Sequence, residues 1–204
     1  MTEKRKKGRH PGKKGGIKSA VKILLAAVLL TGLTLFACLA GRYMEWKEYR
    51  LDYPGEILEY AHAFSLDPYL VAAVIHCESG NRSDAISPKG AVGLMQIMPD
   101  TGAWIAEKLG MDAYSPDMLT DPAVNIRMGC WYLGYLLERF GGALPHALAA
   151  YNAGQGNVDK WLADGAYSQE GVLVKIPFPE TENYVKKVER AYEKYKELSQ
   201  GQLD

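Results

Sequence analysis

The chain has 204 residues, enough for one domain and an appendage, and apolar residue types make up 48% of it. Its 24 basic and 24 acidic residues balance overall, but residues 1–22 hold nine of the basic residues and a single acid, Glu3. The remainder has 15 basic and 23 acidic residues, a net charge of −8. A basic tail therefore precedes an acidic domain. Because this tail lacks interleaved aromatic residues, we predict no nucleic-acid partner.

An apolar segment without a charged residue covers residues 23–41. Nineteen helical residues span roughly 28 Å, close to the ~30 Å hydrocarbon core of a bilayer. The basic residues before this segment predict that residues 1–22 lie in the cytoplasm and the rest of the chain outside it. We therefore predict a single-pass anchor in a bacterial plasma membrane, with residues 42–54 as a short juxtamembrane connector.

Two alternatives involve cleavage of this segment. A secretory signal peptide usually has a shorter apolar core, and no Ala-x-Ala site precedes Arg42. A lipoprotein signal would end at Cys38, but the bulky Phe36 fits that motif poorly and the apolar run continues past the cysteine. The uncleaved anchor is the favoured interpretation, and both cleaved forms stay open.

Residues 55–200 predict a mainly α-helical domain with a minor β element. Asp67-Pro68 and Asp121-Pro122 are typical helix starts, with a capping aspartate before a proline at the first helical position. Gly80 is placed to end the first of these helices, which is apolar nearly all round and should be the central buried helix. The predicted helices cover residues 55–64, 68–79, 100–109, 122–140, 145–151, 158–162 and 181–198. Residues 81–98 predict a turn-rich loop with a small β element, and residues 165–179 an irregular segment with 172–174 extended.

A glutamate, Glu78, lies at the C-terminal edge of the predicted central helix, before a loop rich in glycine, serine and proline. A carboxyl group held half out of water keeps its proton to a higher pH than an exposed one, as a general acid requires. The alternative is a solvated glutamate that ends a helix without a chemical role.

Four sequence blocks follow one another in a distinctive order. They are Glu78-Ser79 with Ser87, the run at 90–99 (GAVGLMQIMP), Ala-Tyr-Asn-Ala-Gly at 150–154, and Glu180-Thr181 with Tyr184-Val185. Together they closely resemble the catalytic domain of the soluble lytic transglycosylases over residues 57–198. That family cleaves the glycan strands of peptidoglycan, and the resemblance implies a lysozyme-like fold of the goose-type lysozyme and transglycosylase class.

The resemblance implies that one glutamate, matching Glu78, acts first as acid and then as base. It protonates the oxygen between N-acetylmuramic acid and N-acetylglucosamine, and then deprotonates the muramic C6 hydroxyl, which closes on C1 to leave a 1,6-anhydro end. Most glycosidases need two carboxyl groups, whereas this route needs no second carboxylate. We therefore expect no second acid to face Glu78 across the groove, and we interpret Asp84 as a turn residue.

The resemblance also implies a set of substrate-binding residues, each with a plainer alternative. Ser87, in a Ser-Pro turn, should donate a hydrogen bond near the acid, and Tyr151 should lie near the acid or the substrate. Asn152, which follows this tyrosine, should also belong to the groove, and its alternative is to cap the helix end. Glu180 should hold the acetamido group or the groove wall, and its alternative is a role as an acid in the first turn of a helix. The predicted residues are Ser87, Gln96, Met98, Tyr151, Asn152, Glu180 and Tyr184.

Three cysteines are present, and Cys77 and Cys130 fall in the domain predicted to lie outside the membrane, where disulfides are allowed. A bridge between them and a pair of buried thiols are both open. The histidines show no metal-ligand spacing, His76 is expected to be a packed histidine, and we predict no metal and no cofactor.

Three other functions compete with a membrane-anchored transglycosylase. A muramidase of the same fold would use water and leave reducing ends. A non-catalytic wall-binding scaffold would have a degenerate groove. Nucleic-acid binding would use the basic tail and would be sensitive to salt. Preference for peptide stems, and cleavage within strands or from their ends, are not predicted.

Overall fold

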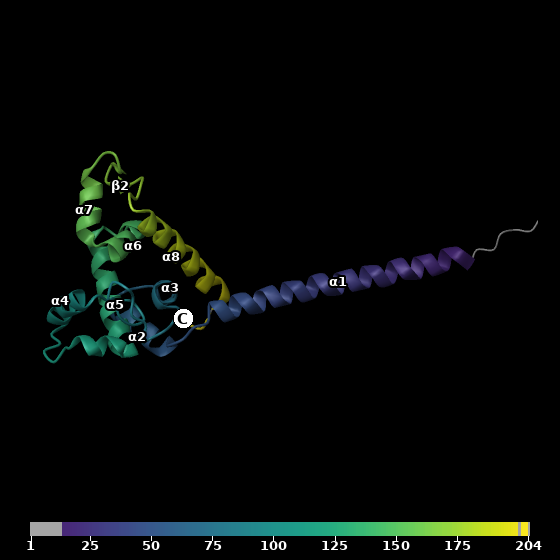
Figure 1. The fold of residues 1–204 in the computed structure, drawn as a ribbon, viewed down its shortest axis with the longest axis horizontal. Helices are drawn as coiled ribbons and strands as arrows, with labels where there is room; N and C mark the ends of the chain where they lie inside the picture. The colour runs from purple at the N-terminus through teal and green to yellow at the C-terminus, as the bar shows by residue number, and fades with distance from the viewer. Residues whose placement is uncertain (1–13, 200, 204) are drawn as a thin grey trace, which may run out of the picture. The chain divides into compact units, whose positions relative to one another are not determined.

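The computed structural model describes residues 14–199 and 201–203, and the first part of the predicted basic tail lies outside these residues. The chain divides into two compact units, residues 1–48 and residues 49–204. The first contains one long helix, α1 (Lys14–Glu48), and the second contains the remaining elements (Figure 1). Each unit is described by itself.

Helix α1 contains the predicted apolar segment. Its stretch from Ser19 to Glu48 is strongly apolar, and its most apolar part is not buried against other residues. By length and composition this helix can cross a membrane, and a signal sequence would have the same properties. The helix continues past residue 41 to Glu48, through part of the predicted connector, because no proline or glycine interrupts residues 42–48.

The second unit begins with two helices that frame the core, α2 (Pro54–Ala63) and α3 (Pro68–Ser79). Helix α3 starts as predicted, because the Asp67 carboxylate accepts a hydrogen bond from the backbone N–H of Tyr69. It ends at Gly80, which adopts a left-handed conformation with φ of 60°. Five successive residues of its centre, 71–75, are buried, which confirms the prediction of a central helix.

The remaining α-helices of this unit follow in chain order. They are α4 (Pro99–Leu109), α5 (Pro122–Arg139), α6 (Leu144–Ala153), α7 (Gln155–Ala163) and α8 (Pro179–Leu198), with a short 3₁₀ helix, η1 (Pro116–Thr120), before α5. The most extensive contact between helices joins α3 to α8, while α6 contacts α5, α7 and α8. In Figure 1, α4 lies at one end of this unit and α7 at the other. The prediction of a mainly helical domain is confirmed.

The strands lie away from the loop that was expected to hold a β element. β1 (Ser168–Gln169) pairs antiparallel with β2 (Val172–Leu173), in agreement with the extended stretch predicted at 172–174. Residues 81–98 contain only two isolated bridges among the residues described, from Val92 to Ile86 and to Ile97. Side-chain hydrogen bonds, described below, maintain this loop instead of a regular ladder.

The two cysteines of this unit are free thiols, so the disulfide alternative is wrong. Cys130 lies fully buried on α5, within the apolar core. Cys77 lies on the side of α3 that faces α8, where its backbone carbonyl accepts a hydrogen bond from Lys187 Nζ (3.2 Å). Burial raises the pKa of the Cys77 thiol to about 11, so this side chain stays protonated and behaves as a small apolar group.

Candidate active site

Glu78 lies one residue before the end of α3 and lines an open cavity of about 560 Å³. The left-handed Gly80 turns the chain sharply away after Ser79, so the loop that follows becomes the facing wall of this cavity. Its other walls come from α6 and from the first turn of α8. The site is therefore assembled from three regions that are distant in sequence, the end of α3 with the loop after it, the end of α6 and the start of α8.

Burial raises the pKa of Glu78 from 4.5 to about 7. Two neighbours on α8 act in the opposite direction, the Tyr184 hydroxyl and the Lys187 ammonium, and the effect of burial exceeds both. A carboxyl group with a pKa near neutrality can both give and take a proton at physiological pH. This is the property that one residue needs to act as acid and then as base.

Two tyrosines, the half-buried Tyr151 and the buried Tyr184, lie near Glu78. The Tyr151 hydroxyl on α6 donates a hydrogen bond to the backbone carbonyl of Met95 (2.8 Å). The Tyr184 hydroxyl on α8 is close enough to Glu78 to influence its pKa, although it makes no hydrogen bond of normal geometry with the described residues. Burial and the nearby carboxylate raise the pKa of both phenols well above 10, so both stay protonated donors.

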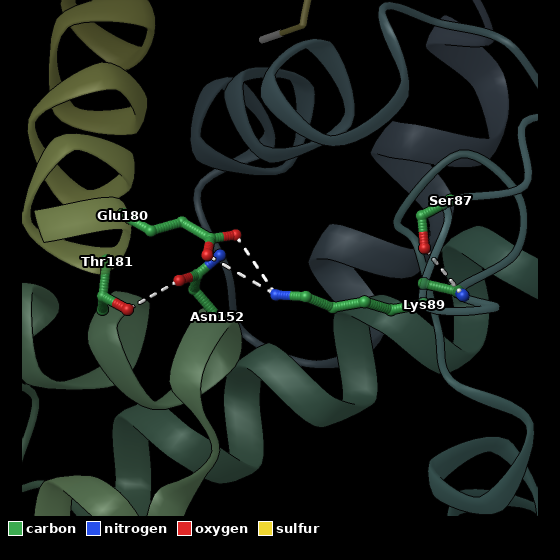
Figure 2. Close-up of polar contacts among 6 residues, drawn as sticks. Ser87, Lys89, Asn152, Glu180 and Thr181 are labelled. Atoms are coloured by element: carbon green, nitrogen blue, oxygen red, sulfur yellow. Dashed lines mark hydrogen bonds and ion pairs between the residues drawn. The ribbon is translucent and has the colours of Figure 1, made fainter. Parts of the chain in front are cut away.

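The facing wall begins with a tight turn at Ser87. The Ser87 Oγ accepts a hydrogen bond from the Ala91 N–H (2.9 Å), and the two backbones are joined by a further bond of 2.9 Å (Figure 2). Because Oγ is the acceptor in this bond, the hydroxyl hydrogen stays available to a ligand. Ser87 lines the same cavity as Glu78, as expected, but its turn role is real as well.

Gln96 and Met98 continue this wall. Gln96 has a left-handed backbone with φ of 49°, and its Nε2 donates to the carbonyls of Ala85 (3.1 Å) and Gly93 (2.9 Å). Its amide thus braces the loop, while the residue lines the cavity. Met98 is 41% exposed and precedes α4, so it presents an apolar surface to the cavity and is not a core residue.

The opposite wall carries two polar side chains, those of Asn152 and Glu180. Asn152 does not cap α6; its Oδ1 accepts a hydrogen bond from Thr181 Oγ1 on α8 (2.8 Å). Glu180, in the first turn of α8, forms an ion pair with Lys89 Nζ (3.4 Å), and Figure 2 shows the lysine extending from the loop toward it. Both partners line the cavity and are largely exposed, at 76% and 72%. The cavity therefore does hold a second carboxyl group, contrary to the expectation of none, but this carboxylate is solvated and paired.

Sequence reasoning missed three residues of this site. Asn125 on α5 is fully buried; its Oδ1 accepts from the Met95 N–H (2.7 Å), and its Nδ2 donates to the carbonyls of Val92 (3.0 Å) and Leu119 (2.8 Å). The other two are Lys89 and Lys187. A polar residue among the apolar positions of α5 was the available signal for Asn125, whereas isolated lysines carry no such signal.

The cavity at Glu78 continues into two smaller ones. A cavity of about 230 Å³ shares Tyr151, Asn152 and two loop residues with it, and also includes Tyr132. A third, of about 330 Å³, shares Tyr132 with the second and is lined further by Trp104 and Gln155. Together they extend the site along α4 and α5, as a polymeric substrate requires.

The described residues contain no group of three or more histidine, cysteine or acidic side chains arranged to hold a metal ion. His76 stacks on the ring of Tyr49, with centroids 4.8 Å apart, and contacts the edge of Tyr195, so it is a packed histidine as predicted. His146 Nε2 accepts a hydrogen bond from the Leu173 N–H (3.0 Å) and thus fixes the β hairpin.

Comparison with known proteins identifies the domain that the four sequence blocks resemble. The family model for the transglycosylase SLT domain matches residues 56–171. The soluble lytic murein transglycosylase of Escherichia coli K12 is 37% identical over 168 residues, which cover 80% of this chain and 26% of that protein. The membrane-bound lytic murein transglycosylase C of Actinobacillus pleuropneumoniae serotype 5b is 32% identical over 66% of this chain and 43% of its own length.

Solved structures agree with these matches. The complex of a 70 kDa soluble lytic transglycosylase with bulgecin A superposes with a TM-score of 0.71 and 32% identity, over 84% of this chain and 28% of that one. The lytic transglycosylase Slt of Pseudomonas aeruginosa was solved as an inactive mutant with glutamine in place of one glutamate. It superposes with a TM-score of 0.66 and 33% identity, over 76% of this chain and 26% of that one. The chain thus spans about a quarter of the length of these soluble relatives. On these matches and on its lysozyme-like fold, the chain belongs to the transglycosylase SLT domain family.

Proposed function

We propose that this protein is a lytic transglycosylase that cleaves the bond between N-acetylmuramic acid and N-acetylglucosamine in peptidoglycan. One observation carries the proposal: in a member of this family, Glu78 opens onto the catalytic cavity with a pKa raised by burial to about 7. A normal glutamate would be almost fully ionised at that pH and could not donate a proton.

In the first step, protonated Glu78 gives its proton to the bridging oxygen. The bond from this oxygen to the muramic C1 breaks, and its electron pair leaves with the N-acetylglucosamine. The 2-acetamido carbonyl of the muramic residue stabilises the positive charge at C1. Glu180, Asn152 and Gln96 line the cavity and supply polar groups for the sugar hydroxyls and amide.

In the second step, ionised Glu78 takes the proton of the muramic C6 hydroxyl, and O6 forms a bond to C1. Glu78 is then protonated again and ready for the next cycle, and no water is consumed. Because O6 and C1 belong to one sugar, ring closure is intramolecular and avoids the entropic cost of recruiting a second molecule. The Tyr184 hydroxyl and the Lys187 ammonium, which both lower the pKa of Glu78, support its ionised form between the two steps.

Product analysis tests this proposal. The full-length protein in detergent is incubated with purified peptidoglycan, beside the Glu78→Gln variant, and the soluble products are identified by mass spectrometry. We expect muramic ends one water lighter than reducing ends from the wild type, and none from Glu78→Gln. Release of reducing ends would instead identify a muramidase, for which the carboxylate of Glu180 in the same cavity is the candidate base. Binding of peptidoglycan without release by either protein would identify a scaffold.

We further propose that α1 anchors the protein in the plasma membrane, with its basic N-terminal end in the cytoplasm and the catalytic unit beside the cell wall. The length and apolar composition of α1 support this, as do the basic residues before it. The test is the size and location of the protein in cells. Membrane association at full length, with residues 49–204 open to external protease in protoplasts, is expected. A shortened, released protein would identify a signal sequence.

A further inference from the structure

A cavity of about 480 Å³ lies outside the catalytic cavity and shares no described lining residue with it. Its walls come from α5 and from the loop between α2 and α3. Three aromatic rings line it, those of Phe64, Trp131 and Tyr135, together with the carboxylate side chain of Glu138. Ser65, in the same wall, has a left-handed backbone with φ of 55°, a conformation that is costly for residues other than glycine.

A continuous series of aromatic rings joins this cavity to the catalytic site. The ring of Tyr151, beside Glu78, contacts Tyr132 with centroids 5.4 Å apart. Tyr132 lies nearly parallel to Tyr135 at 6.4 Å, and Tyr135 stacks on Trp131 at 5.6 Å with only 7° between the ring planes. Three of these four rings belong to one short stretch of α5, so the helix presents them as a row.

The polar contacts follow the same path. The Tyr135 hydroxyl donates a hydrogen bond to Gln155 Oε1 (3.1 Å), and Gln155 lines the third cavity of the catalytic groove. Tyr135 thus lines the outlying cavity and contacts, through Gln155, the groove. The outlying cavity shares no described lining residue with the groove, and the ring contacts and this hydrogen bond connect the two.

Aromatic rings in half-open cavities suit a saccharide. The negative face of an aromatic ring attracts the polarised C–H groups on the flat side of a pyranose ring, and a carboxylate accepts hydrogen bonds from sugar hydroxyls. A glycan strand is a polymer, so it can contact the catalytic groove and a site farther along the chain at once. We propose that the cavity lined by Trp131 and Tyr135 is a distal saccharide-binding site that holds the same glycan strand on which Glu78 acts. This proposal rests on the proposed function.

Packing of α4 on α5 is the competing explanation for these rings, because Trp104 on α4 contacts the edges of Trp131 and Tyr135, each at 5.2 Å. Gly134, which also lines the cavity, separates the two explanations. A Cβ added there would meet the Phe64 carbonyl oxygen at 3.4 Å and nothing closer, so Gly134→Ala fits without strain. Gly134→Leu projects a larger side chain into the cavity and removes none of the aromatic contacts.

The experiment measures binding of glycan strands, freed of peptide stems, by calorimetry. It uses the full-length protein in detergent with Glu78→Gln, so that the strands are not cut, and compares tetrasaccharides with long strands. We expect Gly134→Leu and Trp131→Ala each to weaken the binding of long strands about fivefold, the loss of one aromatic contact, and to leave tetrasaccharide binding unchanged. Gly134→Ala should match the parent protein with both ligands.

Equal weakening for long and short strands, or unchanged binding of long strands by Gly134→Leu, would overturn the distal site. If Trp131→Ala fails to fold, as shown by circular dichroism, Gly134→Leu alone decides the outcome. Because binding is measured without turnover, the result is independent of product chemistry. Failure of the proposed function would appear separately, as the absence of anhydro ends in the wild-type digest.

Discussion

Replacing Glu78 with glutamine is expected to change how the stability of the catalytic unit depends on pH. Burial gives the Glu78 carboxyl a pKa of about 7 in the folded protein, against 4.5 for an unhindered glutamate. The folded protein therefore binds this proton more tightly than the unfolded chain does. The stability that this preference supplies is fully present below about pH 4.5 and is lost as the pH rises through 7.

The size of the effect follows from the two pKa values. Their difference corresponds to about 3 kcal/mol between the acidic and the alkaline limit. Glutamine has a similar shape and does not ionise, so Glu78→Gln escapes this loss. The free energy of unfolding of the variant, relative to the wild type, should therefore rise by about 3 kcal/mol between pH 4 and pH 8.5.

Urea unfolding, followed by circular dichroism at both pH values, measures this difference. Glu107→Gln is the control, because this side chain is 74% exposed and has only a weak ion pair with Lys108. Its unfolding free energy relative to the wild type should stay constant within about 0.5 kcal/mol. A constant difference for Glu78→Gln as well would refute the reasoning, since it would mean that Glu78 titrates alike in the folded and unfolded states.

Three further predictions concern activity and the loop that faces Glu78. The rate of release from peptidoglycan should fall as the pH rises through about 7, because the first step needs protonated Glu78, and a flat profile across this range would exclude that role. Asn125→Leu should lower the free energy of unfolding by about 3 kcal/mol or more, because it leaves two buried backbone groups and one half-buried group without their partner. Asn157→Ala, which removes one half-buried bond, should cost about 1 kcal/mol, and equal losses in urea titrations would contradict this account. Lys89→Met should leave the free energy of unfolding within about 0.5 kcal/mol of the wild type, since its ion pair is exposed. It should raise KM for peptidoglycan about threefold, because the Glu180 carboxylate then faces the substrate without its counter-charge. An unchanged KM, or no recovery in the double variant with Glu180→Gln, would argue against this.

The sequence by itself determined the local features of this protein. Asp67-Pro68 and Gly80 delimit α3 because capping and left-handed termination depend on residues within one turn of the helix end. The apolar N-terminal helix is equally local, since it depends on composition over one stretch. The helix boundaries that were missed, such as the extension of α6 to Ala153, lie where contacts with other elements prolong a helix beyond its own signals.

Only the tertiary structure decided the chemistry of the site. Glu78 has a pKa of about 7 because the packed helices bury it, while Tyr184 and Lys187 on α8, more than a hundred residues away in sequence, limit the rise. The loop facing Glu78 takes its shape from Asn125, and the cavity mouth from an ion pair across 91 residues. Burial and electrostatic interaction depend on distance in space, and the spacing of residues along a chain does not contain that distance until the helices have packed.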